Sequence, residues 1–235
     1  MKKVLFTILF AFTMSVNAQY YSLTYVTVPA ENQEEFVRLE TQYWSKVAKH
    51  NIEAGKQIAW GLVAAIGGTP NGWTHVFVNV YETAEQIADS SIWDPESILG
   101  ISPSEINTLH LVEGRGLQNW AVQSSIPGER GEVAVWNFAR PKNLAGFINE
   151  NKNLWKKQFE KNMGGRTNWG IGLKLNNRTQ DLSTVMTWDG YPNLAEALKA
   201  LNNYEGQMPR QSKMQEYDPD GFTASVIVNH IMWVD

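Results

Sequence analysis

The sequence predicts an α+β fold built from two similar halves, because the chain repeats itself. Residues 25–52 align without a gap with residues 136–163, and the match resumes after a two-residue gap. The matched pairs include Trp44 with Trp155, Trp60 with Trp169, and Gly61 with Gly170. Helix-like and strand-like runs also follow in the same order in both halves. Two copies of one unit predict two similar folded halves that pack on each other.

Each half is predicted to run strand, helix, strand, strand, helix, strand. Runs rich in β-branched and aromatic residues indicate strands, and apolar residues at helical spacing indicate helices. Thr83 and Gln86 predict a capping box at the start of a helix. The first half has strand 21–28, helix 31–49, strands 58–66 and 73–81, a helix from 83 to about 93, and strand 117–124. The second half has strand 132–139, helix 144–162, strands 168–175 and 182–188, helix 193–201 and strand 222–234, after a linker at 124–131.

This order is typical of a ferredoxin-like unit, here present twice in tandem. Each unit forms an antiparallel sheet with its helices on one face. The other face stays apolar and has to be covered. We expect the sheet of the sister half to cover it, so that the two sheets form one pseudo-symmetric α+β barrel.

The order of elements, the aromatic-rich first helix and the Trp-Gly pairs at Trp60 and Trp169 resemble the dimeric α+β-barrel superfamily. That superfamily includes the antibiotic-biosynthesis-monooxygenase-like, NIPSNAP-like and EthD-like families, and the resemblance covers residues 20–235 as a single-chain pseudodimer. It implies activities that range from cofactor-independent oxygenases and isomerases to haem-degrading enzymes. A haem-degrading relative is expected to carry an iron-ligating histidine on the second helix of a unit. Residues 83–93 and 193–201 contain none, so no cofactor is predicted.

The first residues are predicted to be a cleaved signal peptide. Lys2 and Lys3 precede an apolar run that is too short to span a bilayer, and residues 16–18 suit a signal peptidase. We therefore expect a signal peptide at 1–18, a first repeat at 19–124, a second repeat at 125–235, and a periplasmic or secreted protein without stable membrane association after cleavage.

The composition excludes several kinds of partner and chemistry. The chain has no cysteine, which rules out thiol catalysis, disulfides and Cys-ligated metals. The net charge is −4, and removal of Lys2 and Lys3 would make it −6. This balance argues against nucleic acid as a partner. No metal-ligand spacing is present. The internal duplication leaves both a monomer (a pseudodimer) and a homodimer open.

Two titratable residues are candidates for a catalytic pair. Glu40 lies on the apolar side of the first helix, and His75 lies on the third strand. The repeat matches them with Asn151 and Leu182, so only the first half carries a carboxylate and an imidazole there. If His75 faces the helices, Glu40 could orient it as a general base. The alternative is that Glu40 pairs with a basic residue and that His75 is a satisfied interface histidine.

The repeated tryptophans and Asn151 are predicted to line a ligand pocket, with core packing as the alternative. The pocket residues are Trp44, Trp60, Asn151, Trp155 and Trp169. An aromatic cavity with few polar groups suits a small apolar or aromatic molecule. Three functions stay open: a cofactor-independent oxygenase or isomerase, a non-catalytic small-ligand-binding protein, and a structural protein whose cavities are filled by its own side chains.

Overall fold

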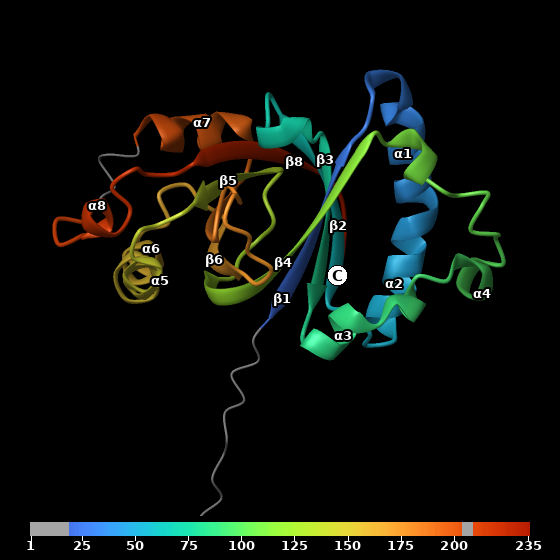
Figure 1. Ribbon diagram of the computed structural model, residues 1–235, viewed down its shortest axis with the longest axis horizontal. Helices are drawn as coiled ribbons and strands as arrows, with labels where there is room; N and C mark the ends of the chain where they lie inside the picture. Colours follow the sequence, from blue (N-terminus) through green and yellow to red (C-terminus); the bar gives the residue numbers. More distant parts are fainter. Residues whose placement is uncertain (1–18, 204–208) are drawn as a thin grey trace, which may run out of the picture.

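The computed structural model describes residues 19–203 and 209–235, and their strands close into one barrel (Figure 1). The order around the barrel is β1-β3-β2-β8-β5-β7-β6-β4, with antiparallel neighbours throughout. The strands are β1 (Tyr20–Thr27), β2 (Ala59–Ile66), β3 (His75–Tyr81), β4 (Gly114–Ile126), β5 (Val133–Ala139), β6 (Asn168–Lys174), β7 (Val185–Tyr191) and β8 (Ala224–Val234).

The two halves contribute strands in equivalent order. The first half supplies β4-β1-β3-β2 and the second supplies β8-β5-β7-β6. The pairs β2–β8 and β4–β6 join the two sheets, so the closing strand of each half pairs with the other half. The predicted fold, two ferredoxin-like repeats in one pseudo-symmetric α+β barrel, is confirmed.

Helices cover the outside of the barrel, and the main helix of each half lies on an opposite flank (Figure 1). In each main helix a π-helical turn joins two α-helical pieces, at Glu40–Trp44 and at Asn151–Trp155. The helices are α1 (Gln33–Leu39), α2 (Ser45–Glu53), α3 (Ala84–Ala88), α4 (Pro95–Leu99), α5 (Leu144–Glu150), α6 (Lys156–Lys161), α7 (Leu194–Asn202) and α8 (Met214–Tyr217).

Alternation along the strands divides the buried side chains among the barrel interior and the helix–sheet layers. On β3, Val76 and Val78 point into the barrel, whereas Phe77 packs under the helix of the first half. The barrel interior is rich in indole rings. A helix–sheet core lies outside the barrel in each half, and a ligand site can form in any of these layers.

The second helix of the first half differs from its prediction. The capping box of Thr83 and Gln86 is present, but α3 ends at Ala88 because the backbone of Asp89 is extended. The Asp89 carboxylate then caps a separate short turn by accepting from the Ser91 amide. The predicted strand 117–124 is longer, because β4 pairs with both β1 and β6.

The predicted signal peptide, residues 1–18, lies outside the described residues. Within the described residues, no helix combines the length and apolar character needed to cross a membrane.

Candidate ligand cavity of the second half

A cavity of about 320 Å³ lies between the main helix of the second half and its sheet. Aromatic rings form much of its wall, and polar side chains from β5 and β7 face it from the sheet. The lining residues used below are Asn137, Asn151, Trp155, Phe159, Arg166, Trp169, Thr187, Asp189 and Met214. The volume is at the lower end of the range for small-molecule sites, about 300–1,000 Å³.

A buried polar network forms the sheet side of this cavity. The Nε of Arg166 donates to Oδ1 of Asp189, and the two side chains form an ion pair that is more than nine-tenths buried. The amide of Asn137 donates to Oδ2 of Asp189 at 3.0 Å and to the Thr187 hydroxyl at 3.4 Å. Ser225 donates to Oδ1 of Asn137 at 2.7 Å. Because the Thr187 oxygen accepts from Asn137, its own O–H is left to donate into the cavity.

The charge state of this network depends on burial and on the attraction between its opposite charges. Burial raises the pKa of Asp189, while the Arg166 guanidinium and the Asn137 amide act in the opposite direction. The guanidinium also lies 4.4 Å from the centre of the Phe159 ring, a cation–π contact. A fixed positive charge therefore lies beside aromatic surface, in a layer that water reaches poorly.

The equivalent positions of the first half are neutral or apolar. Trp60 pairs with Asn79 across β2 and β3, and Trp169 pairs with Asp189 across β6 and β7, so Asn79 is the counterpart of Asp189. The remaining counterparts, from the strand pairing and the sequence match, are Val26 for Asn137, Gln57 for Arg166 and Phe77 for Thr187.

Phe77 packs into the corresponding space of the first half. Its ring centre lies 5.7 Å from that of Phe36 and 6.3 Å from that of Trp60. Phe36 and Trp60 are themselves almost fully buried. In the second half the smaller Thr187 stands at this place, so the same layer has room for a ligand.

Glu40 and His75 face the helix–sheet layer of the first half but have different partners. Oε1 of Glu40 accepts from the Thr108 hydroxyl at 2.7 Å. Nδ1 of His75 lies 2.9 Å from the Thr74 hydroxyl, and its ring packs on Phe36 with centres 5.2 Å apart. No hydrogen bond joins Glu40 to His75 in the described part of the chain. Their role as a catalytic pair stays a prediction.

Burial keeps both groups uncharged near neutral pH. It raises the pKa of Glu40 to about 8, against the hydrogen bond from Thr108, and lowers the pKa of His75 to about 4. A neutral carboxylic acid and a neutral imidazole do not form an ion pair. The structure therefore gives each residue the environment of a satisfied buried polar group.

The predicted pocket residues divide between the two halves. Asn151, Trp155 and Trp169 line the cavity of the second half. Trp60 is buried in the core of the first half, and the indole N–H of Trp44 donates to the Ile106 carbonyl at 2.9 Å. The structure therefore brings three of the predicted residues to one cavity and places the other two in packing positions.

The sequence match does not point to Asp189, because it is shifted by three residues on the third strand, and it does not point to Arg166, because the matching Gln57 gives no sign of an ion pair. An alignment of residues 78–82 with residues 185–189 pairs Asp189 with Glu82, so that two acidic residues coincide. The same alignment, extended to His75, pairs it with Leu182, which is wrong, since Leu182 precedes β7 and strand pairing gives Val185 that place. In the register given by strand pairing, Asn79 of the first half corresponds to the buried Asp189 of the second half.

The described residues offer little to a metal ion, and the second-half cavity offers little to haem. Within 19–203 and 209–235, no group of three or more His, Asp or Glu side chains could hold a metal ion. The described residues that line the second-half cavity include no histidine, cysteine or tyrosine, the usual proximal haem ligands. The cavity therefore does not fit a haem held in the usual way.

Comparison with solved structures shows the same fold in proteins of very different sequence. A candidate monooxygenase from Lactobacillus acidophilus NCFM has a TM-score of 0.55 at 12% identity, over 93% of this chain and 100% of that one. One from Fusobacterium nucleatum subsp. nucleatum has a TM-score of 0.58 at 12% identity, over 94% and 95% of the two chains. An anthrone oxidase-like protein has a TM-score of 0.51 at 11% identity, over 94% of each chain.

No protein-family model and no curated protein matches the chain. At these identities the likeness shows the fold and does not assign a reaction. The chain therefore shares its α+β barrel with proteins named for oxygenase-type activities.

Proposed function

We propose that this protein is a small-molecule enzyme of the oxygenase type and that the cavity of the second half is its site. The substrate class is a small aromatic molecule with an acidic C–H or O–H group, whose anion can react with O₂ without a cofactor. Proteins that share the fold and are named as a candidate monooxygenase or as anthrone oxidase-like suggest the reaction class to test.

One observation carries the proposal: an aromatic cavity that has a buried Arg166–Asp189 ion pair on its sheet side. The rings of Trp155, Phe159 and Trp169 would hold a flat apolar substrate. The positive charge of Arg166 and the hydroxyl of Thr187 would stabilise an oxyanion that forms on it. Fixed donors in a site of low dielectric stabilise developing charge far more strongly than water-exposed donors do.

The proposed oxidation needs no reductant besides the substrate itself. A substrate with an acidic methylene group that is conjugated with a carbonyl through aromatic rings, as in anthrone, loses one proton to solvent and becomes an electron-rich enolate. Reaction with O₂ converts the methylene to a carbonyl, and the second oxygen atom leaves in water together with the two methylene hydrogens. The substrate is oxidised by four electrons and O₂ is reduced. The protein's residues bind the substrate, hold the anion and restrict access of water.

The test is oxygen consumption with anthrone as the probe and no added cofactor, with anthraquinone measured as the product. The double variant Arg166→Met/Asp189→Leu removes both charges at once, because a lone charge left behind would destabilise the core. It should fold and should lose at least about a hundredfold in rate, as expected for loss of a preorganised donor. Thr187→Val should lose less, because the charge remains.

Gln57→Met is the matched control, since Gln57 holds the place of Arg166 in the first half. Its turnover should equal that of the natural chain. Turnover that survives in a folded Arg166→Met/Asp189→Leu variant would show that the cavity is not the site. Loss of turnover in Glu40→Gln or His75→Leu alone would move the site to the first half.

A second candidate, ligand binding without catalysis, is favoured by the state of Asp189. Both of its oxygens already accept hydrogen bonds, from Arg166 and from Asn137, so it is poorly placed to remove a proton. Saturable binding of anthrone, lost in the double variant but accompanied by no oxygen uptake, would select this function. In either case the predicted signal peptide leads us to propose that the protein acts outside the cytoplasm.

A further inference from the structure

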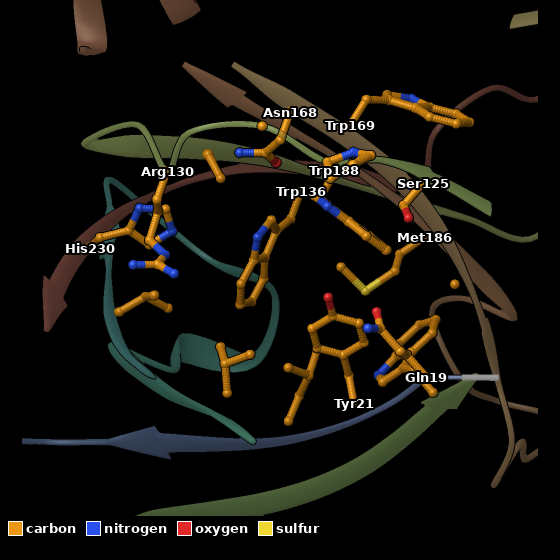
Figure 2. Close-up of a pocket in the computed structure, with 18 of the residues that line it drawn as sticks. Gln19, Tyr21, Ser125, Arg130, Trp136, Asn168, Trp169, Met186, Trp188 and His230 are labelled. Atoms are coloured by element: carbon orange, nitrogen blue, oxygen red, sulfur yellow. The ribbon is translucent and has the colours of Figure 1, made fainter. Parts of the chain in front are cut away.

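A second cavity, of about 260 Å³, lies inside the barrel near one of its ends (Figure 2). This cavity differs in position from the helix–sheet cavity, because strands from both halves surround it. Among the described residues, only Trp169, which lies on the outer side of β6, borders both cavities. The lumen residues used below are Tyr21, Trp120, Arg130, Trp136, Gly172, Met186, Trp188, His230 and Trp233.

The repeated Trp-Gly pair shapes this lumen. A Cβ atom built on Gly61 would lie 2.1 Å from the indole of Trp233, and one built on Gly170 would lie 2.0 Å from the indole of Trp188. Each glycine therefore lets an indole lie flat against the strand. The result is a cavity with planar aromatic walls, and the Tyr21 and Trp188 ring centres are 5.5 Å apart.

One end of the cavity is polar and carries a positive charge. The guanidinium of Arg130 lies 4.2 Å from the Trp233 ring centre and donates to Asp235 at 2.5 Å. His230 holds its Nδ1 2.7 Å from the Gly131 carbonyl, and burial lowers its pKa, so it is neutral with Nδ1–H as donor. Figure 2 shows Arg130 and His230 side by side at this end, whereas Met186 lies at the far side.

Several donors in the cavity wall have no acceptor within the described chain. The indole N–H groups of Trp120 and Trp233 are buried without a partner. The Tyr21 hydroxyl points into the cavity (Figure 2), and burial raises its pKa to about 12, so it remains a neutral donor. Buried donors without partners are rare, because each costs about 1–3 kcal/mol. A bound molecule with acceptor atoms would satisfy some of them.

We propose that the barrel lumen is a binding site for a flat aromatic molecule with one carboxylate group. The ring system lies between the indoles of Trp136 and Trp188, and the carboxylate lies at the polar end. There the ligand carboxylate replaces the Asp235 side chain as the ion-pair partner of Arg130. The small volume limits the ring system to one or two fused rings. Arg130 sets the preference for an anion, in a protein whose overall charge is negative.

The probe is 2-naphthoate, titrated into the purified protein by calorimetry, with neutral 2-naphthamide as its isostere. A Cβ on Gly172 would point into the lumen at ordinary contact distance, 3.7–3.8 Å from its nearest neighbours, and the two methyl groups of a valine would extend from it into the cavity. Gly172→Val should therefore fold and should weaken 2-naphthoate binding at least tenfold. Gly116→Val is the matched strand control, because Gly116 has open space around it and lies away from this cavity, and it should bind normally.

Charge variants test the carboxylate preference. Arg130→Gln should weaken binding of 2-naphthoate severalfold and leave 2-naphthamide unchanged, and Asp235→Asn should strengthen 2-naphthoate binding. The proposal fails if the wild-type protein shows no saturable binding at millimolar probe, or if folded Gly172→Val binds as well as Gly116→Val. It also fails if Thr187→Val abolishes binding, because the probe would then occupy the second-half cavity. Equal effects of Arg130→Gln on both probes would overturn the anionic class.

Discussion

At the scale of single residues, the same layer of the two halves holds polar groups in two different ways. In the first half, Glu40 and His75 are buried singly, and burial keeps each one neutral. In the second half, Arg166 and Asp189 are buried as a pair, and their opposite charges compensate each other. Neutralisation and pairing are the two ways in which a core can hold titratable groups. Of these two layers, only that of the second half, with its Arg166–Asp189 ion pair, keeps a permanent charge next to a cavity.

Glu40 should make the stability of the protein depend on pH. Its pKa is about 8 in the folded state and near 4.5 when unfolded. The unfolded state therefore releases a proton between these values, and stability falls as pH rises by roughly 1.4 kcal/mol per unit. We expect the free energy of unfolding of the natural chain to fall, relative to Glu40→Gln, by roughly 4 kcal/mol between pH 5 and pH 8. Urea denaturation at both pH values measures this difference, and parallel pH profiles would show that Glu40 is ionised in the folded protein.

At the scale of elements, β2 and β6 each combine a helix-facing tryptophan with a lumen-facing glycine. Trp60 and Trp169 fill the helix–sheet layers, and the glycines that follow them make room for indoles from β8 and β7. The pair thus acts on both faces of one strand. Each Trp-Gly pair therefore stabilises the packing of the barrel as well as shaping a pocket.

A methyl group on Gly61 should therefore be costly, whereas one on Gly172 should not. Gly61→Ala would force the Trp233 indole to move and should destabilise the fold by about 1–3 kcal/mol, as overpacking does. Gly172→Ala adds the same methyl group at ordinary contact distance in the same lumen and should be close to neutral. Chemical denaturation of the two variants compares them directly. Equal stability would mean that the Trp233 ring is free to move aside.

The order of the helices and strands can be predicted from the sequence, whereas the contacts that form across strands cannot. The repeat predicts the barrel because strand and helix periodicities are local, and both halves carry them. It also predicts Asn151, Trp155 and Trp169 as pocket residues. Asp189 cannot be identified from the sequence match, because a three-residue shift on β7 sets it opposite Glu82 instead of Asn79, and an odd shift changes the face that a side chain occupies. Arg166 is matched with Gln57, which gives no sign of an ion pair. The lumen could not be predicted, since Trp188 and Trp233 reach it only through pairing across strands.

At the scale of the whole molecule, neither half has a complete core of its own. The strand pairs β2–β8 and β4–β6 cross between the halves, and the lumen contains side chains from both. Trp73 of the first half lies against Trp136 of the second, with ring centres 6.3 Å apart. An isolated half would expose its inner sheet face and two strand edges. Such a surface favours aggregation or association with a second copy.

The barrel should consequently unfold as one cooperative unit although its sequence is a duplication. Phe77→Leu perturbs the helix–sheet layer of the first half, and Gly170→Ala perturbs the second half, where it meets Trp188. Each variant should lower one and the same thermal transition. Near-ultraviolet circular dichroism and calorimetry should report a single midpoint, with equal calorimetric and van't Hoff enthalpies. If instead each variant lowers a different one of two transitions, the halves are independent domains. The lumen would then form only when they dock, and its ligand would raise the midpoint of docking rather than that of folding.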